Sequence, residues 1–158
     1  MTFEVEQTVA FALSKASQSI WALFREEFQA YGITPPQYIL LAILWKSDSM
    51  SRAELAKRCR MDRTTLGGIL DRLAGAGFVE RGPSPEAPRA NRVRLSEKGR
   101  ALFEQEFNRA AQRVRRRIEQ RLVPAEYKQL TELLSKLLMA GEPMSGRHTN
   151  LISLVFNE

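Results

Sequence analysis

The amino-acid sequence predicts a mainly α-helical fold with one small β-hairpin near its middle. Apolar side chains recur at helical spacing over most of the 158 residues. Residues with capping side chains divide that pattern into successive helices. Between residues 78 and 95 the helical pattern stops, and two short alternating runs flank a stretch rich in glycine and proline. A chain of this length is expected to form one domain.

Residues 51–75 predict two short helices with a tight connection. Ser51 and Glu54 have the spacing of a capping box, so the first helix should begin at Arg52, with Leu55 and Ala56 on its buried side. Asp62 can cap a second helix that runs from Arg63 to about Ala74. The core face of this second helix is expected to comprise Leu66, Ile69, Leu70 and Leu73, with Gly75 and Gly77 ending it.

The other face of this second helix carries small, hydroxyl and guanidinium side chains. They are Arg63, Thr64, Thr65, Gly67, Gly68 and Arg72. Hydroxyl groups and N-terminal amides bind phosphates, and arginine reaches base edges, so this face suits a DNA groove. Each glycine costs about 1 kcal/mol relative to alanine inside a helix. The two glycines have two equally good explanations. Either they allow DNA or a neighbouring helix to approach closely, or they are a tolerated weak point in the helix.

Residues 78–81 and 91–95 predict the two strands of the hairpin, with Val93 and Leu95 on one side of the second strand and Arg92 and Arg94 on the other. The loop between the strands is expected to hold Gly82, Pro83, Pro85 and Pro88. Arg89 lies near the tip, where an arginine suits a narrow minor groove. A solvated basic loop is the alternative. Two short helices followed by such a hairpin predict a winged helix-turn-helix, a DNA-binding module.

This central stretch resembles the MarR family of multiple-antibiotic-resistance regulators. The matching residues are Leu55-Ala56, Asp62-Arg63-Thr64-Thr65, Asp71-Arg72-Leu73, Gly77-Phe78-Val79, Arg89, Val93, Leu95-Ser96 and Gly99, with Thr34-Pro35-Pro36-Gln37-Tyr38 upstream. The resemblance implies a dimeric DNA-binding regulator, usually a repressor, that is often released by a small aromatic ligand. Two departures are Ala87, where the family has an aspartate that helps to brace the wing, and the Gly67-Gly68 pair, where the family often has threonine and arginine.

The sequence therefore predicts double-stranded DNA as a partner. The expected DNA contacts are Ser51, Arg52, Arg63, Thr64, Thr65, Gly68, Arg72, Arg89 and Arg92. The expected division is an N-terminal dimerisation helix at 1–33, a DNA-binding lobe at 34–96, and C-terminal dimerisation helices with a tail at 97–158, all in one intertwined domain. The net charge of +6 and the sequence pI of about 9.9 agree with a polyanionic partner.

Composition and motifs argue against other classes of protein. A single cysteine, Cys59, rules out an internal disulfide framework, and the single histidine, His148, rules out a histidine-rich metal site. No catalytic set or phosphate-binding glycine loop is apparent, so neither enzyme activity nor a cofactor is expected. No signal peptide or membrane span is apparent either, which predicts a cytoplasmic protein. Cys59 is expected to be a small, partly buried residue, although Arg58 and Arg60 would lower its thiol pKa.

Long apolar helices flank the central lobe. The pattern predicts a first helix over residues 3–31 that is ended by Gly32, and a second helix that Thr34 and Gln37 cap, with Pro35 at its first position. After the wing, Ser96 should cap a long helix, and Pro124 should begin another that ends at Gly141. The first helix carries more apolar residues than a surface helix with one partner needs, so part of it should meet a second subunit; packing only within its own chain is the alternative. The apolar tail at 142–158 is expected to pack on the terminal helices of the other subunit and so to reinforce a homodimer.

The long helix after Ser96 also carries the densest basic run of the chain, from Arg109 to Arg121. We interpret these arginines as a solvated face, with some of them paired with Glu119 or with acids of another subunit. Contact with DNA phosphates is the alternative. The resemblance places a ligand between the dimerisation helices and the DNA-binding lobe. The candidate ligand residues are Ser17, Trp21, Arg25, Tyr38 and Trp45.

Two functions from different classes remain open at this level. The first is a sequence-specific repressor that binds a pseudo-palindromic operator and is released by an aromatic ligand. The second is a winged-helix protein-interaction module without specific DNA binding, which Gly67, Gly68 and Ala87 would suit.

Overall fold

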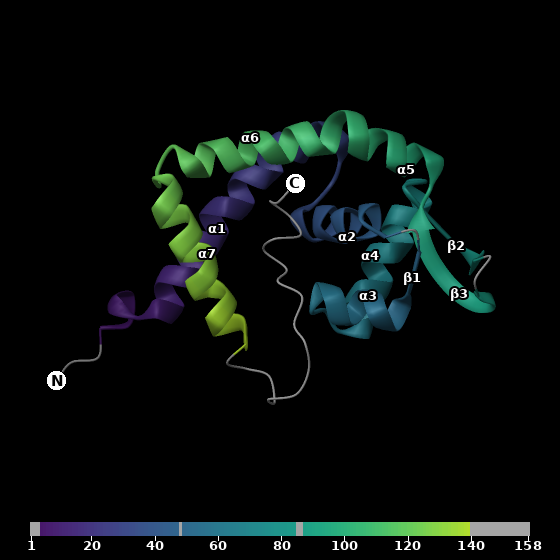
Figure 1. The fold of residues 1–158 in the computed structure, drawn as a ribbon, viewed down its shortest axis with the longest axis horizontal. Helices are drawn as coiled ribbons and strands as arrows, with labels where there is room; N and C mark the ends of the chain where they lie inside the picture. The colour runs from purple at the N-terminus through teal and green to yellow at the C-terminus, as the bar shows by residue number, and fades with distance from the viewer. Residues whose placement is uncertain (1–3, 48, 85–86, 140–158) are drawn as a thin grey trace.

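The computed structural model describes residues 4–47, 49–84 and 87–139. A winged helix-turn-helix lobe lies beneath a long helical rod, and two further helices lie at the other end of that rod (Figure 1). The predicted fold class, mainly helical with a small wing, is confirmed. Gly141, His148 and the apolar tail lie outside the described residues. Among the described residues, no helix has the length and hydropathy that a membrane span needs.

The N-terminal segment is shorter as a helix than the sequence predicts. A 3-10 turn, Val5–Gln7, comes before α1, Val9–Phe28, and another 3-10 turn, Gln29–Tyr31, follows it. The break occurs because the hydroxyl of Thr8 accepts a hydrogen bond from the Phe11 amide at 3.2 Å and so caps α1. Gly32 then takes φ +62°, the left-handed conformation that ends a helix, as predicted.

The lobe begins with α2, Pro35–Trp45, which is buried on nearly every side. Its predicted capping box is confirmed, with Gln37 accepting a hydrogen bond from the Thr34 amide at 2.8 Å. The helix-turn-helix follows as α3, Arg52–Cys59, and α4, Arg63–Gly75. Both begin at the predicted caps. The predicted core side of α4 is also confirmed, because each of its residues is 7% exposed or less; they are Leu66, Ile69, Leu70 and Leu73.

The sheet has three antiparallel strands in the order β1-β3-β2. They are β1, Met50–Ser51, β2, Val79–Ser84, and β3, Ala87–Leu95. The two-residue strand β1 is not predicted, because two residues are too short to show an alternating pattern. It pairs Met50 with Val93 and Ser51 with Arg92, and so joins the start of the helix-turn-helix to the wing.

The hairpin strands are longer than predicted, and the placement of Gly82, Pro83 and Pro88 in a loop is wrong. Gly82 and Pro83 belong to β2, and Pro88 belongs to β3. Proline is tolerated in strands at edges and bulges, where no ladder hydrogen bond is lost. β2 is an edge strand with an irregular register between Gly82 and Ser84, while β1 pairs with β3 only at Arg92 and Val93. Pro85 lies outside the described residues.

The rod consists of α5, Glu97–Leu102, a π-helical turn, Phe103–Phe107, and α6, Asn108–Glu119. Ser96 caps it as predicted, since its hydroxyl accepts a hydrogen bond from the Gly99 amide at 2.9 Å. The π-helical turn is not predicted, and it coincides with the aromatic residues that pack on the lobe. The last helix, α7, Pro124–Met139, starts at the predicted proline. Figure 1 shows the rod extending from the wing to the end where α7 begins.

Candidate nucleic-acid interface

The N-terminus of α4 is fixed by the side chain of Asp62. One carboxylate oxygen accepts a hydrogen bond from the Thr65 amide at 2.8 Å, and the other accepts one from the Thr65 hydroxyl at 2.6 Å. The hydrogen bond from the Thr65 hydroxyl, and then the one from its amide, lower the pKa of Asp62. The Thr65 hydroxyl therefore stabilises the helix start, and its proton is already donated within the chain.

The outward face of α4 presents polar and basic groups to solvent. Arg63, Thr64, Gly68 and Arg72 are exposed, directly opposite the buried leucines of the same helix. Within the described part of the chain, neither Arg63 nor Arg72 forms an ion pair. Their guanidinium groups are therefore available to an external anion such as a DNA phosphate.

Gly67 does not lie on this exposed face, so that part of the prediction is wrong. It is buried, and a Cβ atom at this position would lie 3.0 Å from the Nη2 atom of Arg52. The guanidinium group of Arg52, from the N-terminus of α3, therefore lies against α4 at Gly67. By contrast, a Cβ atom at Gly68 would meet nothing within 4 Å.

The N-terminus of α3 carries the predicted capping box. The Ser51 hydroxyl accepts a hydrogen bond from the Glu54 amide at 3.2 Å, and the Glu54 carboxylate accepts one from the Ser51 amide at 2.7 Å. The latter bond is the main reason that the pKa of Glu54 is lowered. Arg52, one residue into the helix, is exposed.

Three arginines of the wing are held by other parts of the lobe or by the neighbouring strand. Arg81 donates a hydrogen bond to Asp71 of α4 at 2.6 Å, and Arg94 pairs with Glu80 of the adjacent strand at 3.0 Å. Arg92 donates to the hydroxyl and carbonyl oxygens of Ser49. Arg89 belongs to β3, and its side chain is outside the described part of the structure.

These contacts join the root of the wing, where Arg81 of β2 and Arg92 of β3 lie, to α4 and to the segment before β1. Sequence reasoning missed three residues that make these contacts, namely Ser49, Asp71 and Arg81. Each acts through a contact between different elements, with 43 positions separating Ser49 from Arg92 and ten separating Asp71 from Arg81. No local spacing pattern in the chain indicates such a contact.

Three of the six arginines in the basic run of the rod are paired within the chain. Arg113 donates to Glu27 of α1 at 2.6 Å, Arg117 to Glu26 at 2.7 Å, and Arg115 to Glu119 at 2.8 Å. The predicted pairing with Glu119 is confirmed, and the two acids of α1 are additional partners. The guanidinium groups of Arg113 and Arg117 hold α1 against α6.

The candidate ligand residues fall into two groups. The rings of Trp21, Tyr38 and Trp45 belong to one aromatic cluster, linked by Phe24 and Phe103 at centroid distances from 5.2 to 6.0 Å. Ser17 and Arg25 are exposed on α1, one turn before and one turn after the half-buried Trp21. Tyr38 is only 2% exposed, and burial raises the pKa of its hydroxyl.

Cys59 ends α3 and is buried, as expected of a packing residue. Burial raises the pKa of its thiol to about 11, and the opposing effect of Arg58 is smaller. The Arg58 guanidinium instead donates to the Ser47 hydroxyl at 3.2 Å.

Comparison with known proteins places this lobe in a family. Residues 33–90 match the MarR family model. The Salmonella typhimurium multiple antibiotic resistance protein MarR is 32% identical over 106 residues, 67% of this chain and 74% of that protein. The Escherichia coli homoprotocatechuate degradative operon repressor is 29% identical over 87% of this chain and 92% of its own length. The transcriptional regulator TtmR of Methylorubrum extorquens is 30% identical over 62% of this chain, but the match spans only 50% of that regulator.

Solved structures agree over most of the chain. A cysteine mutant of E. coli MarR complexed with operator DNA has a TM-score of 0.76 and 27% identity over 87% of this chain and 99% of its own. Bordetella bronchiseptica BpsR, whose DNA binding is regulated by 6-hydroxynicotinic acid, has a TM-score of 0.79 and 25% identity over 90% of this chain and 100% of its own. The chain therefore belongs to the MarR family of winged-helix transcriptional regulators.

Proposed function

We propose that this chain is a homodimeric, cytoplasmic repressor that binds a pseudo-palindromic DNA site and is released by a small aromatic acid. The outward face of α4 carries the proposal. It presents Arg63, Thr64, Gly68 and Arg72 to solvent, while its other face is buried in the lobe. A helix of this kind can enter the major groove and place arginine and hydroxyl groups at base edges.

The proposed contacts follow from the arrangement of the lobe. Arg63 and Thr64, in the first turn of α4, would read base edges, whereas Arg72 and the N-terminus of α3 would bind phosphates. The closest approach of the helix to the groove would occur at Gly68, which has no side chain. The wing, with Arg89 in β3, would lie along the adjacent minor groove. Two such lobes would bind half-sites about 34–36 Å apart.

The exposed apolar side chains of the flanking helices support the dimer. On α7, Leu130, Leu133, Leu137 and Leu138 are 41–51% exposed, and on α1, Val9 and Leu13 are 64% and 37% exposed. Leu130, Leu133 and Leu137 share one face of α7 by their helical spacing, and a soluble protein rarely leaves such an apolar face in water. The relatives' names support the ligand class, because BpsR responds to 6-hydroxynicotinic acid and a relative represses a homoprotocatechuate degradative operon. The rings of Trp21 and Trp45 and the cation of Arg25 would suit an aromatic acid.

Selection of bound sequences from a random duplex pool, with the full chain at physiological salt, tests the proposal. Enrichment of an inverted repeat is the expected result. Recovery of no preferred sequence, with weak and salt-sensitive binding to every duplex, would contradict specific recognition and favour a protein-interaction module. Release of the selected duplex by aromatic acids, followed by anisotropy, would then test the ligand class.

A further inference from the structure

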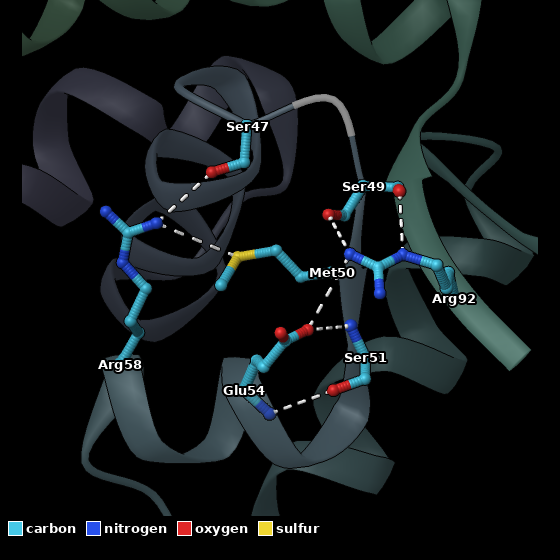
Figure 2. A network of polar contacts seen from close by, with 7 residues as sticks. All are labelled: Ser47, Ser49, Met50, Ser51, Glu54, Arg58 and Arg92. Atoms are coloured by element: carbon cyan, nitrogen blue, oxygen red, sulfur yellow. Dashed lines mark hydrogen bonds and ion pairs between the residues drawn. The ribbon is translucent and has the colours of Figure 1, made fainter. Parts of the chain in front are cut away.

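The side chain of Arg92 points away from the wing surface and into the lobe. It lies on β3, opposite Ser51 of β1. Its Nε atom donates to the Ser49 hydroxyl at 2.8 Å, and its Nη2 atom donates to the Ser49 carbonyl at 2.7 Å (Figure 2). Glu54 of α3 lies 3.7 Å from the same Nη2 atom. One guanidinium group therefore joins the wing, the segment before β1 and the N-terminus of α3.

The charge of this guanidinium is also partly balanced within the chain. The Glu54 carboxylate, whose nearest oxygen accepts the Ser51 amide, is the anion beside it (Figure 2). Only 22% of the Arg92 side chain is exposed, compared with 51% for Arg94 two residues further along β3. A DNA phosphate could use Arg92 only after the contacts with Ser49 were broken, and this would cost hydrogen bonds to a charged donor.

We propose that Arg92 is a positioning residue that fixes the root of the wing against the helix-turn-helix, and that it does not neutralise a DNA phosphate. This inference rests on the proposed function, because the positioned element is the DNA-binding wing. The strand β3 carries the wing, and its angle to α4 depends on what holds its base. The hydrogen bonds of Arg92 with Ser49 attach the base of β3 to the segment before β1. The hydrogen bond of Arg81 with Asp71 attaches the neighbouring strand β2 to α4.

Arg94 offers a matched control. It has the same charge, lies on the same strand and the same side of it, and is paired with Glu80 of the neighbouring wing strand at 3.0 Å. This pair joins the two strands of the wing to each other, so its loss leaves the root attached to the lobe. Arg92→Ala and Arg94→Ala therefore remove equal charge but different connections.

The first test measures DNA affinity of the full chain by anisotropy, with the duplex obtained from the selection, over a range of salt concentrations. Ser49→Ala removes only the hydrogen bond to the hydroxyl, and it should weaken binding by about five- to tenfold; Arg92→Ala also removes the one to the Ser49 carbonyl, and it should weaken binding at least as much. The double variant should be no weaker than Arg92→Ala, because the Ser49 hydroxyl has already lost its partner in that variant. The slope of log affinity against log salt should stay unchanged in all three variants.

The opposite results would overturn the proposal. A lost phosphate contact reduces the salt slope by about 0.9, and Ser49→Ala, which removes no charge, would then leave affinity unchanged. Arg92→Lys is also decisive. It keeps the charge but cannot reproduce the two contacts of the guanidinium, so it should bind DNA as weakly as Arg92→Ala. Wild-type affinity in Arg92→Lys would mean that charge alone matters.

The second test needs no DNA, so it remains informative if no sequence is enriched in the selection. Amide hydrogen exchange of residues 91–95 should be faster in Arg92→Ala than in Arg94→Ala or the unmodified chain, because the root of the wing is no longer held. Equal exchange in Arg92→Ala and the unmodified chain would contradict the positioning role, even if specific DNA binding had been established.

Discussion

Gly99 lies in the first turn of α5, directly against the backbone of Phe78. A Cβ atom at this position would lie 2.1 Å from the Phe78 carbonyl oxygen, which itself accepts the Ser96 amide at 3.0 Å. Ser96 also donates its hydroxyl proton to the Gly77 carbonyl at 2.6 Å. The absence of a side chain at Gly99 is therefore what lets the rod begin immediately beside the wing.

Gly99→Ala should lower the free energy of unfolding by about 3 kcal/mol or more, because the obstructing atoms belong to backbone and cannot rotate away. Urea unfolding followed by circular dichroism measures the change. The matched control is Gly75→Ala, also on a helix, where a Cβ atom would meet nothing within 4 Å. Equal stability of the two variants would mean that the contact with Phe78 is not a real constraint.

The burial of Cys59 makes its thiol unreactive in the folded chain. Its pKa is about 11 instead of the usual 9.0, so at pH 8 the folded chain should hold about a hundredfold less thiolate than the unfolded one. Disulfide-exchange reagents should react slowly with native protein and quickly in urea. The folded pKa is the higher one, so this group's contribution to stability is complete below pH 9 and is lost towards pH 11. Fast native reaction at pH 8 would refute the assignment.

At the scale of single elements, α4 combines a buried leucine face with two central glycines that have different surroundings. Gly67 is covered by Arg52, whereas Gly68 is open to solvent. A helix without a functional constraint would gain stability from alanine at Gly68. The open glycine is therefore explained best by an external surface that approaches the helix there, and the proposed surface is the DNA groove.

Gly68→Ala should raise the free energy of unfolding by up to about 1 kcal/mol, the difference in helix propensity. The same variant should bind the selected duplex more weakly, because the added methyl group separates α4 from the groove. Gly75→Ala, at the C-terminal end of α4, serves as the control and should leave DNA affinity unchanged. Undiminished affinity in Gly68→Ala would exclude close approach of DNA at this position.

The rod shows how a basic run can serve packing. In α6, Arg113 and Arg117 reach Glu27 and Glu26 of α1, and Arg115 pairs along its own helix. The Glu27 side chain is only 19% exposed, so its pair with Arg113 is shielded from solvent more than the other two. Two arginines of this run thus serve the contact between α1 and α6, and DNA binding is proposed at the other end of the rod.

At the scale of the whole molecule, apolar side chains are distributed unevenly between the two ends of the rod. The lobe buries its leucines completely, whereas α7 and the start of α1 leave theirs in solvent. The Arg60 guanidinium of the lobe donates to the Leu138 carbonyl of α7 at 2.9 Å. The exposed face of α7 is the surface that the proposed dimer would bury.

Leu133→Lys should convert the chain to monomers and weaken binding of the selected duplex, because burial of a charged group in an apolar interface is unfavourable. Light scattering after size exclusion measures the mass. Glu132→Lys, an exposed neighbour on α7 that is charged already, is the control and should leave the mass unchanged. A dimer that persists in Leu133→Lys would place the interface elsewhere.

The sequence alone determined the helices, because their signals are local. Capping boxes at Ser51 and Thr34, the cap at Asp62 and the glycine at position 32 act within one helical turn, so their spacing can be read directly. Periodicity likewise determined the buried face of α4 and the inward side of β3. These signals were sufficient to predict the winged helix-turn-helix and the exposure of Arg63, Thr64, Gly68 and Arg72, but not the burial of Gly67.

Tertiary structure decided the contacts between elements distant in the chain. The third strand, the burial of Gly67 under Arg52 and the attachment of Arg92 to Ser49 all depend on segments that meet only after folding. An arginine that alternates outward on a strand has the same sequence pattern whether it faces solvent or a partner 43 residues away. The physical reason is that capping and periodicity operate over one or two turns, whereas charge pairing and close packing depend on three-dimensional distance.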